Sequence, residues 1–115
     1  MVTLYGLPNC DTCRKAQKLL QAEGVDFRFH DLRKDGLDRA MLDRWLAAAG
    51  NEALVNRRST TWRSLSDADR ALAHGDGVAE LLLANPTLVK RPILETGKHC
   101  LVGFREQDYR QLPQG

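Results

Sequence analysis

The chain is organised around Tyr5-Gly6-Leu7-Pro8-Asn9-Cys10-Asp11-Thr12-Cys13-Arg14-Lys15, which places two thiols three residues apart. Residues 1–5 are rich in β-branched and aromatic side chains, and this composition predicts a short strand. Gly6 and Pro8 interrupt the pattern, as expected where a strand enters a loop. An amphipathic helix is predicted next, because apolar residues recur at helical spacing at Cys13, Ala16, Leu19 and Leu20. The cysteines are therefore predicted to lie where a strand gives way to a helix.

Cys10 is placed at or just before the first turn of this helix. Unpaired backbone N–H groups and the positive end of the helix dipole favour an anion there, which would be the Cys10 thiolate. A helix terminus contributes about 0.3–1 kcal/mol, up to about 2 kcal/mol, and one pKa unit corresponds to about 1.4 kcal/mol. The dipole alone therefore lowers the pKa of Cys10 by about one unit or less. A larger decrease requires hydrogen bonds from backbone N–H groups and the Cys13 thiol, and cations such as Arg14 or Lys15.

Two other interpretations of the cysteine pair stay open on these grounds: inert packing in the core, or half of a zinc site. A zinc site requires about four ligands. Beyond the pair, and without a second close pair, the sequence offers only Cys100, His30, His74 and His99. We therefore expect no metal and no bound cofactor, and we interpret the pair as redox-active or nucleophilic.

Length and composition are those of an ordinary globular protein. At 115 residues, with 43% hydrophobic and 28% charged residues, the chain is long enough for one domain with its own core. No apolar run approaches the ~20 residues that span a bilayer, and no signal peptide is evident, so we expect a cytoplasmic protein without membrane contact. Three cysteines, an odd number, fit transient chemistry in a reducing compartment. The net charge of +2 predicts no nucleic-acid binding, and we expect a monomer.

The residues after the first helix predict a second strand. Gly24 is placed to end the helix, and residues 25–30 then alternate apolar and polar side chains, as a half-buried strand does. The strand, helix and strand together have the length of a β-α-β unit with a right-handed crossover. We therefore predict that the first two strands are parallel.

Between about residues 38 and 85 the sequence predicts helices without strands. The first of these helices begins near Asp38 and carries an amphipathic pattern. Ser66 and Asp69 resemble a capping box that opens another helix. Asp76 is placed to cap the last one. The chain is thus predicted to leave the sheet for a helical segment before it returns.

Residues 89–95 and 98–104 predict two strands joined by a tight turn, and residues 106–112 predict a short final helix. The order β-α-β, helical insertion, β-β-α is that of an α/β protein with a thioredoxin-like fold. We therefore predict one domain over residues 1–115 with an all-helical insertion at about residues 38–85.

Four stretches of the sequence resemble the arsenate reductase-like family, which comprises the ArsC, Spx and YffB branches. They are residues 5–16 around the cysteine pair, Arg58-Ser59-Thr60-Thr61-Trp62, the stretch from Asn85-Pro86 to Lys90-Arg91-Pro92-Ile93, and Val102-Gly103-Phe104. The resemblance covers nearly the whole chain. It is closest to the YffB branch, which is similar in Phe29-His30-Asp31, Asp35-Gly36-Leu37-Asp38 and Thr60-Thr61-Trp62.

This resemblance implies a thioredoxin-like fold with a helical insert, and Cys10 as the nucleophile. It also implies an anion or glutathione site, in which Arg58 and Arg91 match two of the arginines around the nucleophile of arsenate reductases. Pro92 matches the proline that follows a cis peptide bond near the thiol in thioredoxin-like folds. The position of a third arginine falls at Gly103, which disfavours arsenate as the substrate.

The remaining candidate residues are interpreted as structural. Cys100 lies on a predicted strand, where a lone cysteine is expected in the core. His30 and His99 lie on predicted strands without a paired ligand. Arg57 is expected to be simply solvated, and Arg58 is preferred over it because of the family match.

Two functions of different classes follow from these observations. The first is a glutathione-dependent thiol reductase, in which the Cys10 thiolate attacks an oxidised sulfur or oxyanion and Cys13 or glutathione resolves the adduct. Such a thiol-disulfide or arsenate-type oxidoreductase would use glutathione as co-substrate, or a glutaredoxin-type reductant. The second is a redox-sensing module that resembles Spx and binds RNA polymerase through an interface that a Cys10–Cys13 disulfide alters. A true arsenate reductase is a further alternative. Arginines directed at the thiol favour the enzyme, and residues 29–42 differ from the Spx branch.

Overall fold

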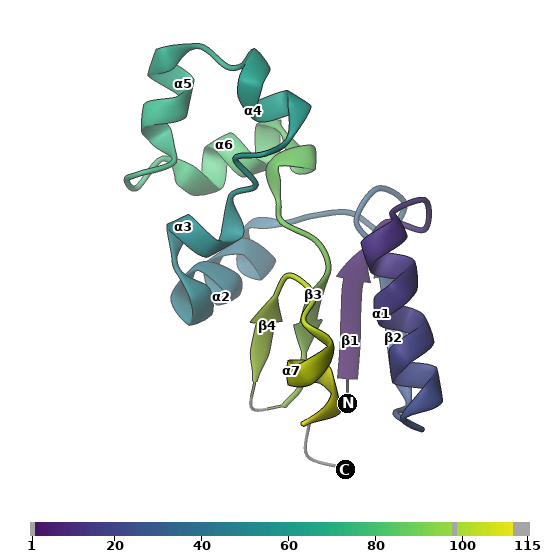
Figure 1. Cartoon of the computed structure of the whole chain (residues 1–115). Coiled ribbons are helices and arrows are strands. Elements are labelled where there is room, and N and C mark those ends of the chain that lie inside the picture. Colours follow the sequence, from purple (N-terminus) through teal and green to yellow (C-terminus); the bar gives the residue numbers. More distant parts are fainter. Residues whose placement is uncertain (1, 98, 112–115) are drawn as a thin grey trace. The chain divides into compact units, whose positions relative to one another are not determined.

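A computed structural model describes residues 2–97 and 99–111 (Figure 1). The chain separates into two compact units. The sheet unit comprises Met1–Gly36 and Arg91–Gly115, and the helical unit comprises Leu37–Lys90. The single domain over residues 1–115, with an insertion at about residues 38–85, stays a prediction.

The sheet unit contains four strands in the order β2-β1-β3-β4. Their bounds are β1 (Val2–Gly6), β2 (Phe27–Asp31), β3 (Ile93–Glu95) and β4 (Cys100–Val102). β1 and β2 are parallel, as predicted, with Val2 opposite Phe27 and Gly6 opposite Asp31. β3 is antiparallel to both β1 and β4, so the predicted hairpin is confirmed. This mixed sheet is that of a thioredoxin-like fold.

The hairpin strands are shorter than predicted from the sequence. Val89 forms an isolated antiparallel bridge with Val55 inside the helical unit instead of extending β3. Pro92 has no N–H to donate and directly precedes β3. Gly103 follows β4 with a φ of +86°, a left-handed conformation that ends the strand. Lys98, at the predicted start of this strand, lies outside the described residues.

Two helices pack against each other beside the sheet (Figure 1): α1 (Asp11–Ala22) and α7 (Glu106–Arg110). The predicted apolar face of α1 is buried at Cys13, Ala16 and Leu20. The core of this unit joins both helices to β1 and β3 through Leu4, Ala16, Leu20, Leu94 and Tyr109. The predicted final helix ends at Arg110, and Leu112 lies outside the described residues. The start of α1, which carries the cysteine pair, lies a short loop beyond the carboxyl end of β1.

The helical unit is built from short helices. They are α2 (Arg39–Ala49), α3 (Asn51–Leu54), α4 (Thr60–Ser64), α5 (Asp67–Leu72), α6 (Val78–Ala84) and the 3-10 helix η1 (Pro86–Leu88). The side chains of Asp38 and Ser66 cap α2 and α5 by accepting backbone N–H groups at 2.9 and 3.1 Å. The predicted Ser66 cap and the predicted helix start near Asp38 are therefore confirmed. The predicted Asp76 cap is wrong, because the chain makes a further turn before α6 and Gly77 becomes its N-cap.

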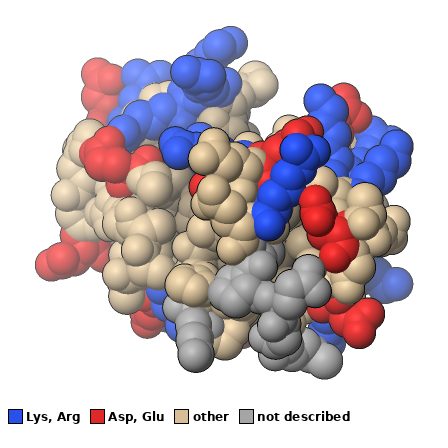
Figure 2. Space-filling view, turned by 60° about the horizontal axis from the view of Figure 1, so that its bottom comes forward, with Lys and Arg blue, Asp and Glu red and all other residues tan. Residues whose placement is uncertain are grey.

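Acidic and basic side chains are mixed on the face of the molecule that Figure 2 shows, where blue and red atoms lie side by side. This mixture agrees with the small net charge of +2. Among the helices of the described residues, none combines the length and the apolar content needed to cross a membrane.

Candidate active site

Cys10 is the N-cap residue of α1, in agreement with its predicted place at the start of the helix. Its backbone is extended, with φ −99° and ψ 122°. Its N–H donates to the carbonyl of Leu7 at 3.3 Å, and its own carbonyl accepts the N–H of Arg14 at 2.9 Å. No side chain caps α1 at this end. The N–H groups of the first turn are therefore available to an anion at the Cys10 sulfur.

The pKa of the Cys10 thiol lies below its ordinary value. Burial raises this pKa, but hydrogen bonds from the N–H and the thiol of Cys13 lower it, and so do a hydrogen bond and the charge of Arg91. The predicted cation Arg14 is engaged elsewhere, because its guanidinium pairs with the Asp11 carboxylate at 2.6 Å. The cation identified at Cys10 is thus Arg91 rather than Arg14, while a contribution of Lys15 stays a prediction.

Cys13 differs from Cys10 in both exposure and acidity. Its side chain lies against Gly6 and is fully buried. Burial and the neighbouring Cys10 thiol raise the pKa of Cys13 to about 12, against opposing effects of the Leu7 N–H and Arg91. Cys10 therefore ionises first, while Cys13 stays protonated and donates to it.

Arg91 is held by the segment that leads into β3. The Arg91–Pro92 peptide bond is cis, as the family resemblance implied. Pro92 is fully buried, and its carbonyl accepts the N–H of Gly103 at 2.8 Å. The Nε atom of Arg91 is also buried and has no hydrogen-bond partner among residues 2–97 and 99–111. The described structure thus brings Cys10, Cys13, Arg91 and Pro92 together in the sheet unit.

Arg58 belongs to the helical unit, in the loop before α4. Its backbone N–H donates to the side-chain oxygen of Asn56 at 3.1 Å. Its side chain is exposed and forms no hydrogen bond or ion pair within the part of the chain that the structure describes. Its convergence with Arg91 on Cys10 stays a prediction.

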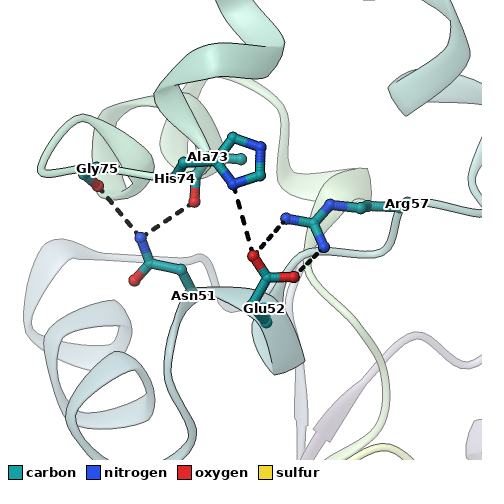
Figure 3. A network of polar contacts seen from close by, with 6 residues as sticks. All are labelled: Asn51, Glu52, Arg57, Ala73, His74 and Gly75. Carbon is teal, nitrogen blue, oxygen red and sulfur yellow. Dashed lines mark hydrogen bonds and ion pairs between the residues drawn. The ribbon is translucent and has the colours of Figure 1, made fainter.

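Arg57, beside Arg58, takes part in a polar network of the helical unit (Figure 3). Its guanidinium forms two hydrogen bonds to the carboxylate of Glu52 and lies over the ring of Trp62, 5.5 Å from the centroid. The Nδ1 atom of His74 lies 3.5 Å from the same carboxylate. The prediction that Arg57 is simply solvated is therefore wrong. No sequence signal could have indicated the network, because Glu52 and Arg57 are five residues apart and lack helical spacing.

The other histidine and cysteine candidates have structural surroundings. The Nε2 atom of His30 lies 2.8 Å from the carbonyl oxygen of Gly36, and its ring packs on Tyr5 with centroids 4.9 Å apart. The structural interpretation of His30 is therefore confirmed. Cys100 is half-buried on β4, an edge strand, and does not lie in the core. Within the described ranges, no three His, Cys, Asp or Glu residues are grouped so that they could hold a metal ion.

A sheet of this order, with a cysteine pair at the start of its first helix, defines a thioredoxin-like protein. The model of the ArsC family matches residues 5–112. The chain belongs to this arsenate reductase-like family.

Relatives match along almost the whole chain. An uncharacterised protein of Haemophilus influenzae is 41% identical over 110 residues, which are 96% of each chain. The global transcriptional regulator Spx of Streptococcus pyogenes serotype M6 is 35% identical over 112 residues, which are 96% of this chain and 83% of that protein.

Solved structures confirm the fold. A YffB protein is 41% identical with a TM-score of 0.89, and the match covers 95% of this chain and 96% of that one. The solution structure of an arsenate reductase-related protein from Brucella melitensis is 44% identical with a TM-score of 0.76, covering 94% and 90% of the two chains. The similarity to YffB that the sequence predicted is therefore confirmed.

Proposed function

We propose that this chain is a glutathione-dependent thiol reductase with Cys10 as its nucleophile. The observation that carries the proposal is the environment of Cys10, whose pKa falls below its ordinary value despite burial because Cys13 and Arg91 stabilise the thiolate. A lowered pKa increases the thiolate fraction near neutral pH, and the thiolate is the form that attacks disulfides. Similarity at 44% identity to an arsenate reductase-related structure supports a reductase.

The reaction starts when the Cys10 thiolate attacks one sulfur of a disulfide that contains glutathione. A bond forms between the Cys10 sulfur and that sulfur, and the other sulfur leaves as a thiolate with the electron pair of the broken bond. Cys13 or a second glutathione thiolate then attacks the mixed disulfide and releases the bound thiol, which takes up a proton. If Cys13 performs this step, glutathione or a glutaredoxin-type reductant reduces the resulting Cys10–Cys13 disulfide.

The arginines give this proposal its preference for glutathione. A planar guanidinium can hold a carboxylate through two hydrogen bonds and stays charged at physiological pH. As glutathione-binding residues we propose Arg91 and Pro92 of the sheet unit and Arg58 of the helical unit. Arg91 would thus bind the co-substrate and also keep the Cys10 pKa low.

Turnover of a glutathione mixed disulfide, coupled to glutathione reductase, tests the enzyme directly. We expect Cys10→Ser to abolish turnover and Cys100→Ser, the matched control, to leave it unchanged. Arg91→Gln should raise the KM for glutathione, whereas Lys90→Gln removes a neighbouring charge and should not. Full turnover by the Cys10→Ser protein would exclude Cys10 as the nucleophile.

One observation favours a second candidate function. The Spx regulator of Streptococcus pyogenes is 35% identical over 96% of this chain, so a redox-sensing module that binds RNA polymerase is the alternative. Capture of RNA polymerase by the reduced protein but not by the oxidised protein, or the reverse, would support it. Loss of that difference in Cys13→Ser would attribute the switch to the cysteine pair.

Arsenate is the less favoured substrate. The position at which arsenate reductases would carry a third arginine is Gly103, which is buried and has a φ of +86°. A larger residue adopts this left-handed conformation only with strain. Arsenate should therefore be turned over far more slowly than a glutathione disulfide.

A further inference from the structure

The hydroxyl of Tyr109 is buried without a hydrogen-bond partner in the sheet unit. Tyr109 is 2% exposed, and its Oη atom meets no donor or acceptor among the described residues. Buried hydroxyls normally find a partner, because their transfer out of water destabilises the fold when the hydrogen bond to water is not replaced. A phenylalanine ring, which lacks the hydroxyl, would stabilise the core more than this tyrosine does. The hydroxyl therefore requires an explanation other than packing.

The ring of Tyr109 is fixed in place by its neighbours. It contacts the ring of Phe104 edge-on, with centroids 4.9 Å apart. It belongs to the same core cluster as Leu4 of β1 and Ala16 of α1. The hydroxyl thus projects from a ring that the core holds between α1 and the sheet.

Cys13 faces the same side of the sheet as this core cluster. On α1 it precedes Ala16 by three residues, so the two side chains share one helical face. Its sulfur packs against Gly6, which lies two residues beyond Leu4 and hence on the same face of β1. Burial raises the pKa of Tyr109, and the nearby Cys13 charge raises it further. The Tyr109 hydroxyl is therefore a neighbour of Cys13 that stays protonated.

The proposed reaction leaves Cys13 in need of such a donor. Cys13 must become a thiolate to resolve the mixed disulfide, yet burial holds its thiol in the protonated form. The Leu7 N–H and the charge of Arg91 lower the pKa of this thiol, but they do not offset burial, and the pKa stays at about 12. A neutral O–H donor can stabilise it without adding a charge to the core.

We propose that the Tyr109 hydroxyl donates a hydrogen bond, directly or through one water, to the Cys13 sulfur as that sulfur attacks the mixed disulfide at Cys10. This inference rests on the proposed function. In the step, the Cys13–Cys10 S–S bond forms and the bond from Cys10 to the substrate sulfur breaks. The substrate thiolate leaves with the electron pair of that bond and takes up the proton that Cys13 has released.

The resolving step can be measured by itself in a Cys100→Ser protein, which keeps only the two thiols of the pair. Cys10 is converted to its mixed disulfide with 5-thio-2-nitrobenzoate, whose release by Cys13 is followed by absorbance. Tyr109→Phe should slow this release by about tenfold or more, as expected when a hydrogen bond to a charged group is lost. Tyr5→Phe is the matched control, because Tyr5 faces the opposite side of β1 and packs on His30. We expect the control to release the label at the parent rate.

Two further readouts separate this role from a structural one. Tyr109→Phe should leave the alkylation rate of Cys10 unchanged, and its melting temperature should equal or exceed that of the parent because an unpaired hydroxyl has been removed. Equal release rates in Tyr109→Phe and Tyr5→Phe would overturn the proposal, as would a large loss of thermal stability in Tyr109→Phe. The proposal for Tyr109 would also be overturned if the parent protein never released the label. The proposed reductase function is tested separately, by turnover with glutathione.

Discussion

The sulfur of Cys13 fills the space that a side chain at Gly6 would occupy. A Cβ atom placed on Gly6 would lie 2.5 Å from the Cys13 sulfur and 3.3 Å from the Cys13 Cβ, well inside ordinary contact distance. Glycine at this position therefore allows α1 to bring its first buried residue directly against the end of β1. The close approach sets where Cys13 lies and, three residues earlier in the chain, where α1 presents Cys10.

Gly6→Ala should destabilise the protein by about 1–3 kcal/mol, the usual range when a methyl group is forced into a packed core. The free energy of unfolding, measured in urea, gives the change. Gly75→Ala is the control, since a Cβ there meets no atom within 4 Å. Combining Gly6→Ala with Cys13→Ala should recover part of the loss, because the second change removes the sulfur that causes the clash. Strict additivity of the two changes would contradict this packing.

The acidity of Cys10 should depend on Arg91. Removing the guanidinium in Arg91→Gln takes away both a hydrogen bond and a positive charge that lower the Cys10 pKa. The pKa should therefore rise, and the rate of alkylation near neutral pH should fall. Lys90→Gln removes the adjacent positive charge and should leave the alkylation profile unchanged. If both variants matched the parent across the pH range, Arg91 would not be the cation that acts on the thiol.

Cys13 should make the protein less stable in alkali. Its thiol has a pKa of about 12 in the folded chain and an ordinary value of 9.0, so between these values the native state binds the proton more tightly than the unfolded state. Stability is therefore expected to fall as pH rises from about 9 to about 12. In Cys13→Ala, the free energy of unfolding should fall less steeply with pH across that interval, by a slope that corresponds to at most one bound proton. Urea unfolding at several pH values measures this slope. Tyr109 remains in both proteins, so its contribution cancels in the comparison.

The parts of the fold that sequence analysis predicted are those with local signals. The start of α1 at Cys10 follows from a strand pattern, two helix breakers and an apolar helical period. The Ser66 cap follows from side-chain chemistry within one turn. The Asp76 cap was predicted from the same kind of signal and is wrong, because the chain makes a further turn, in which the Val78 N–H donates to the Gly75 carbonyl, and Gly77 becomes the N-cap of α6.

The features of the site that local sequence patterns do not indicate depend on contacts between distant segments. Arg91 acts on Cys10 although the two residues are far apart in the sequence, and only the family resemblance indicated this role. The pattern around α1 suggested Arg14 instead, but the Asp11 carboxylate pairs with that guanidinium. The sequence predicts a short final helix over residues 106–112. It does not show that the Tyr109 hydroxyl is buried without a partner, because that depends on every neighbouring element.

The Glu52 carboxylate should titrate according to its pairing with Arg57. A hydrogen bond from Arg57 holds the pKa of Glu52 below its ordinary value, with a smaller contribution from His74. Arg57→Gln should therefore raise the Glu52 pKa, and His74→Gln should raise it less. NMR titration of the side-chain carboxyl carbon measures both changes. Equal shifts in the two variants would contradict the order of these contributions.

Replacing Gly103 with arginine, the residue of arsenate reductases at this position, should not create an arsenate reductase. Gly103 has a φ of +86°, is buried, and donates its N–H to the Pro92 carbonyl at 2.8 Å. A side chain at this φ costs about 1–2 kcal/mol, and arginine would add the burial of a charge. Urea unfolding should therefore rank Gly103→Asn above Gly103→Ala in stability, because asparagine tolerates the left-handed region, and should place Gly103→Arg lowest. A Gly103→Arg protein as stable as the parent, or one that gains arsenate turnover, would show that the backbone at this position does not exclude the third arginine.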